Sequence, residues 1–202
     1  MRAPLAVPLV LALLLALGLA GCIEGRVFPA EIPAANLASG WSYSASNSFD
    51  GVAGQEPFVR AHYRVNVYAQ GPEAVALVIS MPDVPLVDVQ GIVTEQLDKF
   101  LLDRGITTTF HSSGTGEVGG QPVEYTVSTA NRQGVGGSAQ GFAIDVPYRC
   151  AANGQHVRIF GFAATTTTLL GRPITDRATW EELAGRADQG TLGGMVRHVR
   201  CS

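Results

Sequence analysis

The stretch AVALVISM, residues 74–81, is a nearly continuous apolar run that Gly71-Pro72 precedes and Pro82 ends. A strand with one wet face alternates apolar and polar residues, whereas a strand that is covered on both faces is apolar throughout. We therefore predict that residues 74–81 form the central strand of a sheet, and that the remaining elements pack around it.

A helix is expected soon after this strand, because apolar residues recur there at spacings of three and four. Asp88 stands where an N-cap is expected, and Gly105 stands where a helix often ends in the left-handed conformation. We predict a helix over residues 88–104 whose apolar stripe packs on the sheet. The stripe consists of Val89, Ile92, Val93, Leu97, Phe100 and Leu101.

Several other segments are predicted to be strands. Residues 59–68 alternate apolar and polar side chains, and His62, Arg64 and Asn66 share the polar face, which is more typical of a solvated sheet face than of a ligand site. Asn153-Gly154 predicts a hairpin with a two-residue type I′ turn. A marginal strand is expected over 41–49, and further strands over 106–111, 122–129, 142–150 and 155–164.

The C-terminal part is expected to be helical. A helix begins near Asp176, and after a glycine-rich interruption apolar residues again fall at helical spacing. The predicted fold class is therefore α+β, a mainly antiparallel sheet packed by the central helix and by a C-terminal helical segment. The later apolar residues are Leu192, Met195, Val196 and Val199.

The composition fits one globular domain. The chain has 202 residues, of which 46% are hydrophobic and 15% charged, and its 24 glycines and 11 prolines favour a strand-rich, turn-rich fold. The formal net charge is -3, and no basic stripe is present. We therefore expect no nucleic-acid partner.

The N-terminus has the three-part layout of a secretory signal, with a positive residue at Arg2, an apolar core and small residues at the cleavage point. Leu19-Ala20-Gly21-Cys22 at its end resembles the lipobox of prokaryotic lipoproteins. The resemblance implies that Cys22 becomes lipid-modified and forms the mature N-terminus. A transmembrane anchor is the alternative, although the apolar run is at the lower limit for spanning a bilayer.

The predicted division of the chain follows from this leader. Residues 1–21 are a lipoprotein signal peptide, residues 22–40 a flexible tether, and residues 41–202 a single α+β domain. The tether is expected from Pro29, Pro33 and small residues without sustained periodicity. The predicted location is extracytoplasmic, with the lipid on Cys22 in a cell or outer membrane.

The order of strands, helix, antiparallel strands and terminal helix is similar to the PsbP-like fold of several small envelope lipoproteins. The resemblance covers residues 41–202 and rests on this order, on Gly120-Gln121-Pro122 before a strand, and on the late hairpin. Members of that fold are largely binding or assembly factors, so the resemblance implies no catalytic residues. Fold alone does not fix function.

Two glycine-containing motifs suggest chemistry but lack its context. Residues 114–119 match G-x-G-x-x-G, yet a strand-like run follows instead of the helix that would hold a pyrophosphate, so we expect a hairpin loop over residues 112–120. A second glycine-rich loop is expected over residues 131–137, and residues 137–141, which begin at its end, miss the nucleophile elbow of hydrolases by one position. We predict neither a nucleotide site nor a serine nucleophile.

Cys150 and Cys201 remain as a pair once Cys22 is lipidated, and a disulfide between them is the first hypothesis for an oxidising compartment. A zinc site formed with His156 and His198 is the alternative. If Asn153-Gly154 is a two-residue turn, His156 points to the face opposite Cys150, which disfavours the metal.

These observations predict a non-catalytic binding or envelope-assembly module without a cofactor or metal. Its expected partners are the membrane, through the lipid on Cys22, and an unidentified protein or small molecule. The alternative is a small envelope enzyme or metal-binding protein that uses His62, His111, His156 or His198, for which three of these side chains must lie together in a cleft.

Overall fold

The computed structural model describes residues 23–25, 27–53, 59–71, 74–84, 88–134, 137–164, 168–169, 172–173 and 192–201. Within these residues, nine strands form one sheet and two short strands pair separately. The strands are β1 (Ile23–Gly25), β2 (Ser42–Tyr43), β3 (Phe49–Ala53), β4 (Val59–Gln70), β5 (Ala74–Met81), β6 (Ile106–Val118), β7 (Gln121–Gly134), β8 (Gly137–Arg149), β9 (His156–Ala164), β10 (Thr168–Leu169) and β11 (Arg172–Pro173). The helices are η1 (Ala34–Asn36), α2 (Val89–Asp103) and α4 (Leu192–Arg197).

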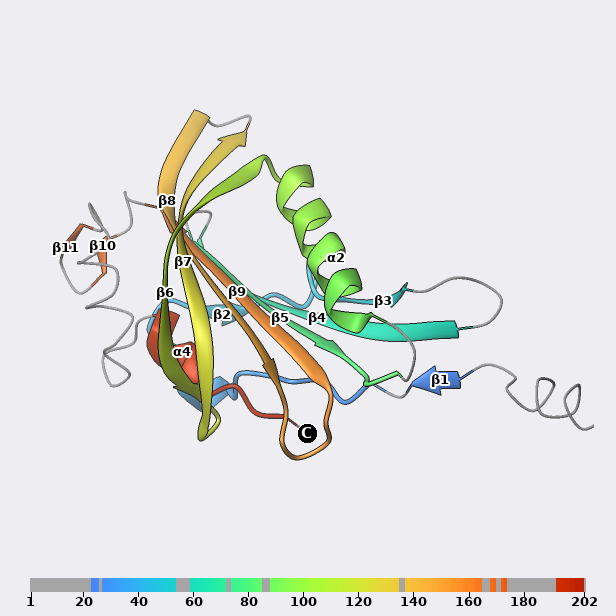
Figure 1. The fold of residues 1–202 in the computed structure, drawn as a ribbon. Helices are drawn as coiled ribbons and strands as arrows, with labels where there is room; N and C mark the ends of the chain where they lie inside the picture. Colours follow the sequence, from blue (N-terminus) through green and yellow to red (C-terminus); the bar gives the residue numbers. More distant parts are fainter. Residues whose placement is uncertain are drawn as a thin grey trace, which may run out of the picture.

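The main sheet has the order β1-β4-β5-β9-β8-β7-β6, and β2 and β3 also pair with β4 (Figure 1). After the β4–β5 hairpin, α2 crosses over and the chain returns through β6, β7 and β8 to β9, which pairs with β5. Leu77 of β5 stands opposite Phe160 of β9. The predicted central strand is therefore confirmed, and the sheet is antiparallel except where β1 runs parallel to β4.

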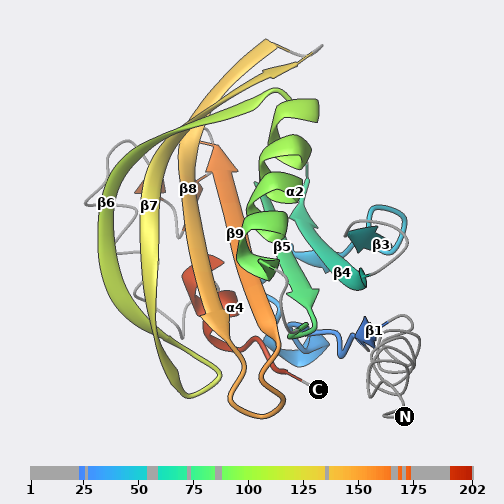
Figure 2. The same ribbon diagram turned by 45° about the vertical axis from the view of Figure 1, so that its right-hand side comes forward.

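The predicted central helix is also confirmed. Oδ1 of Asp88 accepts a hydrogen bond from the backbone N–H of Gly91 over 2.9 Å, and Gly105 follows the helix with φ +66°. Figure 2 shows α2 lying along one face of the sheet. Val93, Leu97 and Leu101 are buried there in a cluster with apolar side chains of β4, β5 and β9.

The N-terminal segment and α4 cover the opposite face of the sheet. Ala30, Ile32 and Trp41 are buried in one cluster with Met195 of α4. A flexible tether through residue 40 is therefore wrong for the residues from Ala30 onward, which belong to the packed structure. Of the predicted C-terminal helical segment, α4 is described, while the helix expected near Asp176 lies outside the described residues.

Hydrogen bonds explain why the N-terminal segment packs on the sheet although it has few regular elements. The backbone N–H of Ala30 donates to Oγ of Ser80, and the N–H of Ile32 donates to the hydroxyl of Tyr68. The amide of Asn66 donates to the carbonyl oxygen of Ala30 over 2.8 Å. The predicted solvated face of β4 is thus covered at Asn66, which is 5% exposed.

A β-bulge in β6 allows this strand to contribute side chains to the buried clusters on both faces of the sheet. The register with β7 shifts between Phe110 and Ser112, so side chains two apart along the chain switch faces at that point. Ile106 consequently packs on the α2 side, whereas Val118 packs on the α4 side. The hairpin loop expected over residues 112–120 is mostly strand, and only Gly119-Gly120 form the turn.

Apart from Gly119 in the turn, both glycine motifs lie in strands. Gly114 stands opposite Tyr125 of β7, and a Cβ atom on Gly114 would overlap the Tyr125 ring. Gly114 therefore makes room for an aromatic side chain. Of the loop expected over residues 131–137, residues 131–134 end β7 and Gly137 begins β8, so residues 137–141 form the start of β8.

Candidate functional site

The predicted lipidation site, Cys22, and the signal peptide over residues 1–21 lie outside the described residues. None of the described helices is long and apolar enough to cross a membrane. The remaining candidate residues can be placed.

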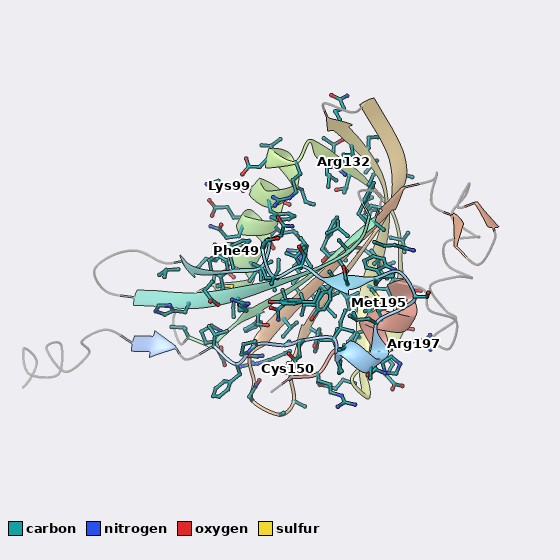
Figure 3. All side chains as sticks on the ribbon, turned by 180° about the vertical axis from the view of Figure 1, so that it is seen from behind. Phe49, Lys99, Arg132, Cys150, Met195 and Arg197 are labelled. Carbon is teal, nitrogen blue, oxygen red and sulfur yellow. A yellow bond between two sulfur atoms is a disulfide. The ribbon has the colours of Figure 1, made fainter. Side chains whose placement is uncertain are left out.

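Cys150 and Cys201 lie at disulfide distance, with their Cα atoms 6.2 Å apart. Cys150 is buried at the end of β8, and Figure 3 shows it on the same side of the sheet as Met195. The hydroxyl of Tyr148 lies 3.6 Å from Sγ of Cys201. The structure therefore brings together the two cysteines that the sequence analysis paired.

The turn beside Cys150 is longer than predicted. The N–H of Cys150 donates to the carbonyl oxygen of Gln155, and four residues, 151–154, form the loop instead of two. Because this shifts the register by two residues, an even number, no side chain changes face. His156 consequently still lies on the face opposite Cys150, and the zinc alternative does not assemble.

The four histidines come from separate parts of the structure. His62 lies on β4 opposite Val52, His111 lies at the bulge of β6, and His198 is exposed after α4. His156 lies on β9, with Nε2 3.8 Å from Oδ1 of Asp83. Among the described residues, no group of three His, Cys, Asp or Glu side chains is placed to hold a metal ion.

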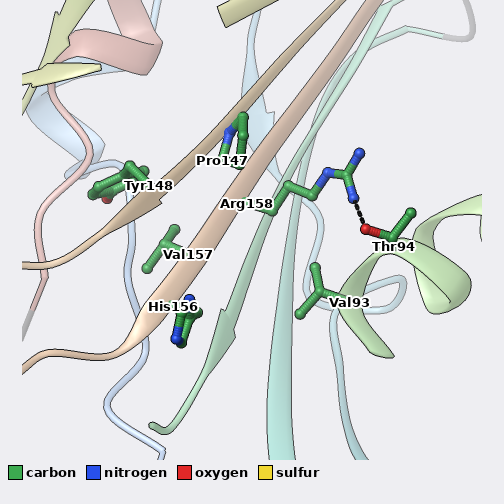
Figure 4. A pocket seen from close by; sticks show the side chains of 7 residues that line it. All are labelled: Val93, Thr94, Pro147, Tyr148, His156, Val157 and Arg158. Carbon is green, nitrogen blue, oxygen red and sulfur yellow. Dashed lines mark hydrogen bonds between the residues drawn. The ribbon is translucent and has the colours of Figure 1, made fainter. Parts of the chain in front are cut away.

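A pocket of about 230 Å³ lies between α2 and the adjoining ends of β8 and β9 (Figure 4). Val93 and Thr94 project from the helix, and His156 and Arg158 project from β9 on the same face. The lining therefore combines apolar side chains with the imidazole of His156 and the guanidinium of Arg158. The lining residues are Val93, Thr94, Pro147, Tyr148, His156, Val157 and Arg158.

Arg158 is a charged residue of this pocket that three hydrogen bonds hold in place. Its Nε and Nη2 donate to the two carboxylate oxygens of Asp145 over 2.8 and 2.6 Å, and Nη1 donates to the hydroxyl of Thr94 over 2.5 Å. The Arg158 and Asp145 side chains are only 17% and 21% exposed. Three of the five guanidinium N–H groups are thus engaged, and the guanidinium plane is fixed.

Burial alone would lower the pKa of Arg158, but the hydrogen bonds and charge of Asp145, together with the charge of Asp98, raise it above its ordinary value. The guanidinium therefore stays cationic inside the pocket. A second ion pair, between Arg149 and Asp83, lies beside His156.

A larger, more open hollow of about 490 Å³ lies between the N-terminal segment and β4. Arg64 donates to Asp50, Tyr43 and Asn66 over 2.8, 3.0 and 3.1 Å. Burial opposes the charge of Arg64, but the Tyr43 hydrogen bond and the charge of Asp50 raise its pKa. Of the predicted polar face, Arg64 and Asn66 line this hollow and His62 does not.

We call the pocket between α2 and the ends of β8 and β9 the α2 pocket. It is the stronger candidate binding site, because its ion pair is mostly buried, whereas Asp50 in the open hollow is 74% exposed. The sequence analysis did not single out Thr94, Asp145 or Arg158. The sequence does contain one indication of this ion pair. Asp145 and Arg158 are opposite charges inside two apolar strands that form one hairpin.

Comparison of the chain with protein-family models, curated proteins and solved structures found no match.

Proposed function

We propose that this protein is an extracytoplasmic lipoprotein, anchored through a lipid on Cys22, that acts by binding and without catalysis. It serves as an accessory module of the cell envelope, in keeping with the resemblance to PsbP-like lipoproteins. The leader sequence supports the anchor, and the cysteine pair at disulfide distance is compatible with an oxidising compartment. The proposal retains a C-terminal helical segment, of which α4 is the described part.

The observation that carries the binding role is the α2 pocket. It lies between a helix and two strands, which hold its walls rigidly, and it offers apolar surface beside a fixed cation. Asp145 compensates the charge of Arg158, so the ligand does not need a full negative charge. The two remaining guanidinium N–H groups of Arg158 are suited to a hydrogen-bond acceptor.

The size of the pocket limits the ligand. A volume of about 230 Å³ holds a small organic molecule or a single side chain of a protein partner. We therefore propose a ligand group that carries a carbonyl, carboxylate or hydroxyl oxygen next to an apolar part. The oxygen accepts from Arg158, and the apolar part contacts Val93 and Pro147.

Protein-detected NMR with a library of carboxylate, amide and alcohol fragments tests this role. Binding fragments are expected to shift the backbone signals of Thr94, His156 and Arg158. Thr94→Trp fills the pocket and abolishes these shifts, whereas Lys99→Trp, on an exposed position of the same helix, preserves them. The spectra themselves report whether each variant is folded.

Two results would overturn the binding role. One is that no fragment shifts the pocket signals of the wild-type protein. The other is that folded Thr94→Trp binds the same fragments as strongly as Lys99→Trp does.

A further inference from the structure

The first described strand begins immediately after the proposed lipidation site. Ile23 follows Cys22 in the sequence and pairs with Val59, at the start of β4. The pairing continues to Gly25, which stands opposite Ala61. One residue spans at most about 3.6 Å, so almost no free chain separates a lipid on Cys22 from the sheet.

The start of β4 lies at one extremity of the sheet. β5 pairs with β4 only from Arg64 onward, and β1 pairs with the stretch before it. β3 pairs with the other edge of β4, from Val65 to Ala61. Figures 1 and 2 show β1 and β3 on the two sides of the start of β4, and we call these three strand segments the β1–β3 corner.

Apolar side chains are exposed at this corner. Phe49 and Val52, both on β3, are 39% and 55% exposed. Figure 3 shows Arg132, near the end of β7, well away from Phe49. Aromatic and aliphatic side chains at a protein surface favour the boundary between lipid headgroups and acyl chains.

We infer that the β1–β3 corner is the membrane-facing surface of the protein, with Phe49 and Val52 in contact with the lipid headgroup layer. The inference rests on the proposed lipid anchor at Cys22. Because β1 is hydrogen-bonded to β4, the anchor fixes the orientation of the whole sheet as well as its distance from the bilayer. Strands β6, β7 and β8, at the other edge of the sheet, then lie away from the membrane.

Quenching by brominated lipids tests this orientation. The full-length lipidated protein is reconstituted in phosphatidylcholine vesicles with or without bromine on the acyl chains, which quenches indole fluorescence only at short range. Val52→Trp adds a reporter at the corner, and Phe110→Trp adds one at a site on β6 that is also mostly exposed (67%). The wild-type protein provides the background of Trp41 and Trp180.

The added indole of Val52→Trp is expected to lose at least half of its emission in brominated vesicles, whereas that of Phe110→Trp keeps it. Equal quenching at both positions, or quenching at neither, would overturn the orientation. Mass spectrometry of the same vesicles separates the two proposals. An unmodified Cys22 refutes the anchor itself, while a lipidated Cys22 with the wrong quenching pattern refutes only the orientation.

Discussion

Cys150 and Cys201 lie with their Cα atoms 6.2 Å apart, which places the end of the chain beside the β8–β9 hairpin. The two residues are separated by 51 positions in the sequence. A bridge between them therefore closes a long loop and restricts the unfolded chain more than the folded one.

Replacement of the more exposed cysteine, Cys201→Ser, is expected to lower the free energy of unfolding by about 2–4 kcal/mol under oxidising conditions. Urea denaturation of the two proteins measures the difference. In the presence of a reductant the wild-type protein loses the same stability, so the two curves converge. Two reactive thiols at Cys150 and Cys201 in the denatured, unreduced wild-type protein would contradict the bridge.

The Arg158–Asp145 ion pair predicts an asymmetry between single and double variants. Asp145→Asn leaves a mostly buried guanidinium without its counter-charge and is expected to cost about 1–3 kcal/mol of stability. Asp145→Leu combined with Arg158→Met removes both charges and is expected to cost less. Urea denaturation provides both values.

The exposed pair Arg64–Asp50 is the matched control. Asp50→Asn is expected to cost less than about 1 kcal/mol, because Asp50 is 74% exposed and its charge is screened. If Asp50→Asn and Asp145→Asn cost the same, burial does not distinguish the two pairs and the account of Arg158 is wrong.

Gly105, which ends α2, combines positive φ with close packing. A Cβ atom there would overlap the carbonyl oxygen of Gln133, so Gly105→Ala is expected to cost more than about 2 kcal/mol. Gly71 also has positive φ but has open space around it, and Gly71→Ala is expected to cost about 1–2 kcal/mol. Thermal denaturation ranks the two variants, and a reversed rank would refute the close approach to Gln133.

Burial raises the pKa of Tyr148 above its ordinary value of 10.0. Below pH 10 the phenol is neutral in both the folded and the unfolded states. Above pH 10 the unfolded state releases the proton while the folded state retains it, so the stability contribution is lost as the pH rises. Tyr148→Phe is therefore expected to lose less stability than the wild-type protein between pH 9 and pH 11. Identical slopes in urea denaturation across this range would show that Tyr148 ionises freely in the fold.

The elements that the sequence predicts best depend on local chemistry. The apolar stripe of α2, the Asp88 cap and the left-handed Gly105 involve residues within one helix and its ends. The pairing of Leu77 with Phe160 has no such local signal, because these residues meet only after the chain has crossed over through α2 and three strands. The partner of the central strand therefore could not be predicted.

Two errors have physical reasons. The segment with Pro29 and Pro33 lacks periodicity, but its backbone is held by Ser80, Tyr68 and Asn66 from distant strands. The Asn153-Gly154 turn has four residues instead of two, and this register brings Arg158 opposite Pro147 and next to Asp145. A two-residue turn would have placed Arg158 opposite Arg149, which is why the ion pair of the pocket was missed.

We propose that Cys22 is the lipid-bearing N-terminus of a folded envelope protein. Mass spectrometry of the mature protein, purified from native membranes, measures this directly through the mass of the N-terminal peptide. The account predicts a chain that starts at Cys22 and carries a diacylglyceryl group on its sulfur. A chain that retains Met1, or one whose Cys22 is unmodified, would contradict it.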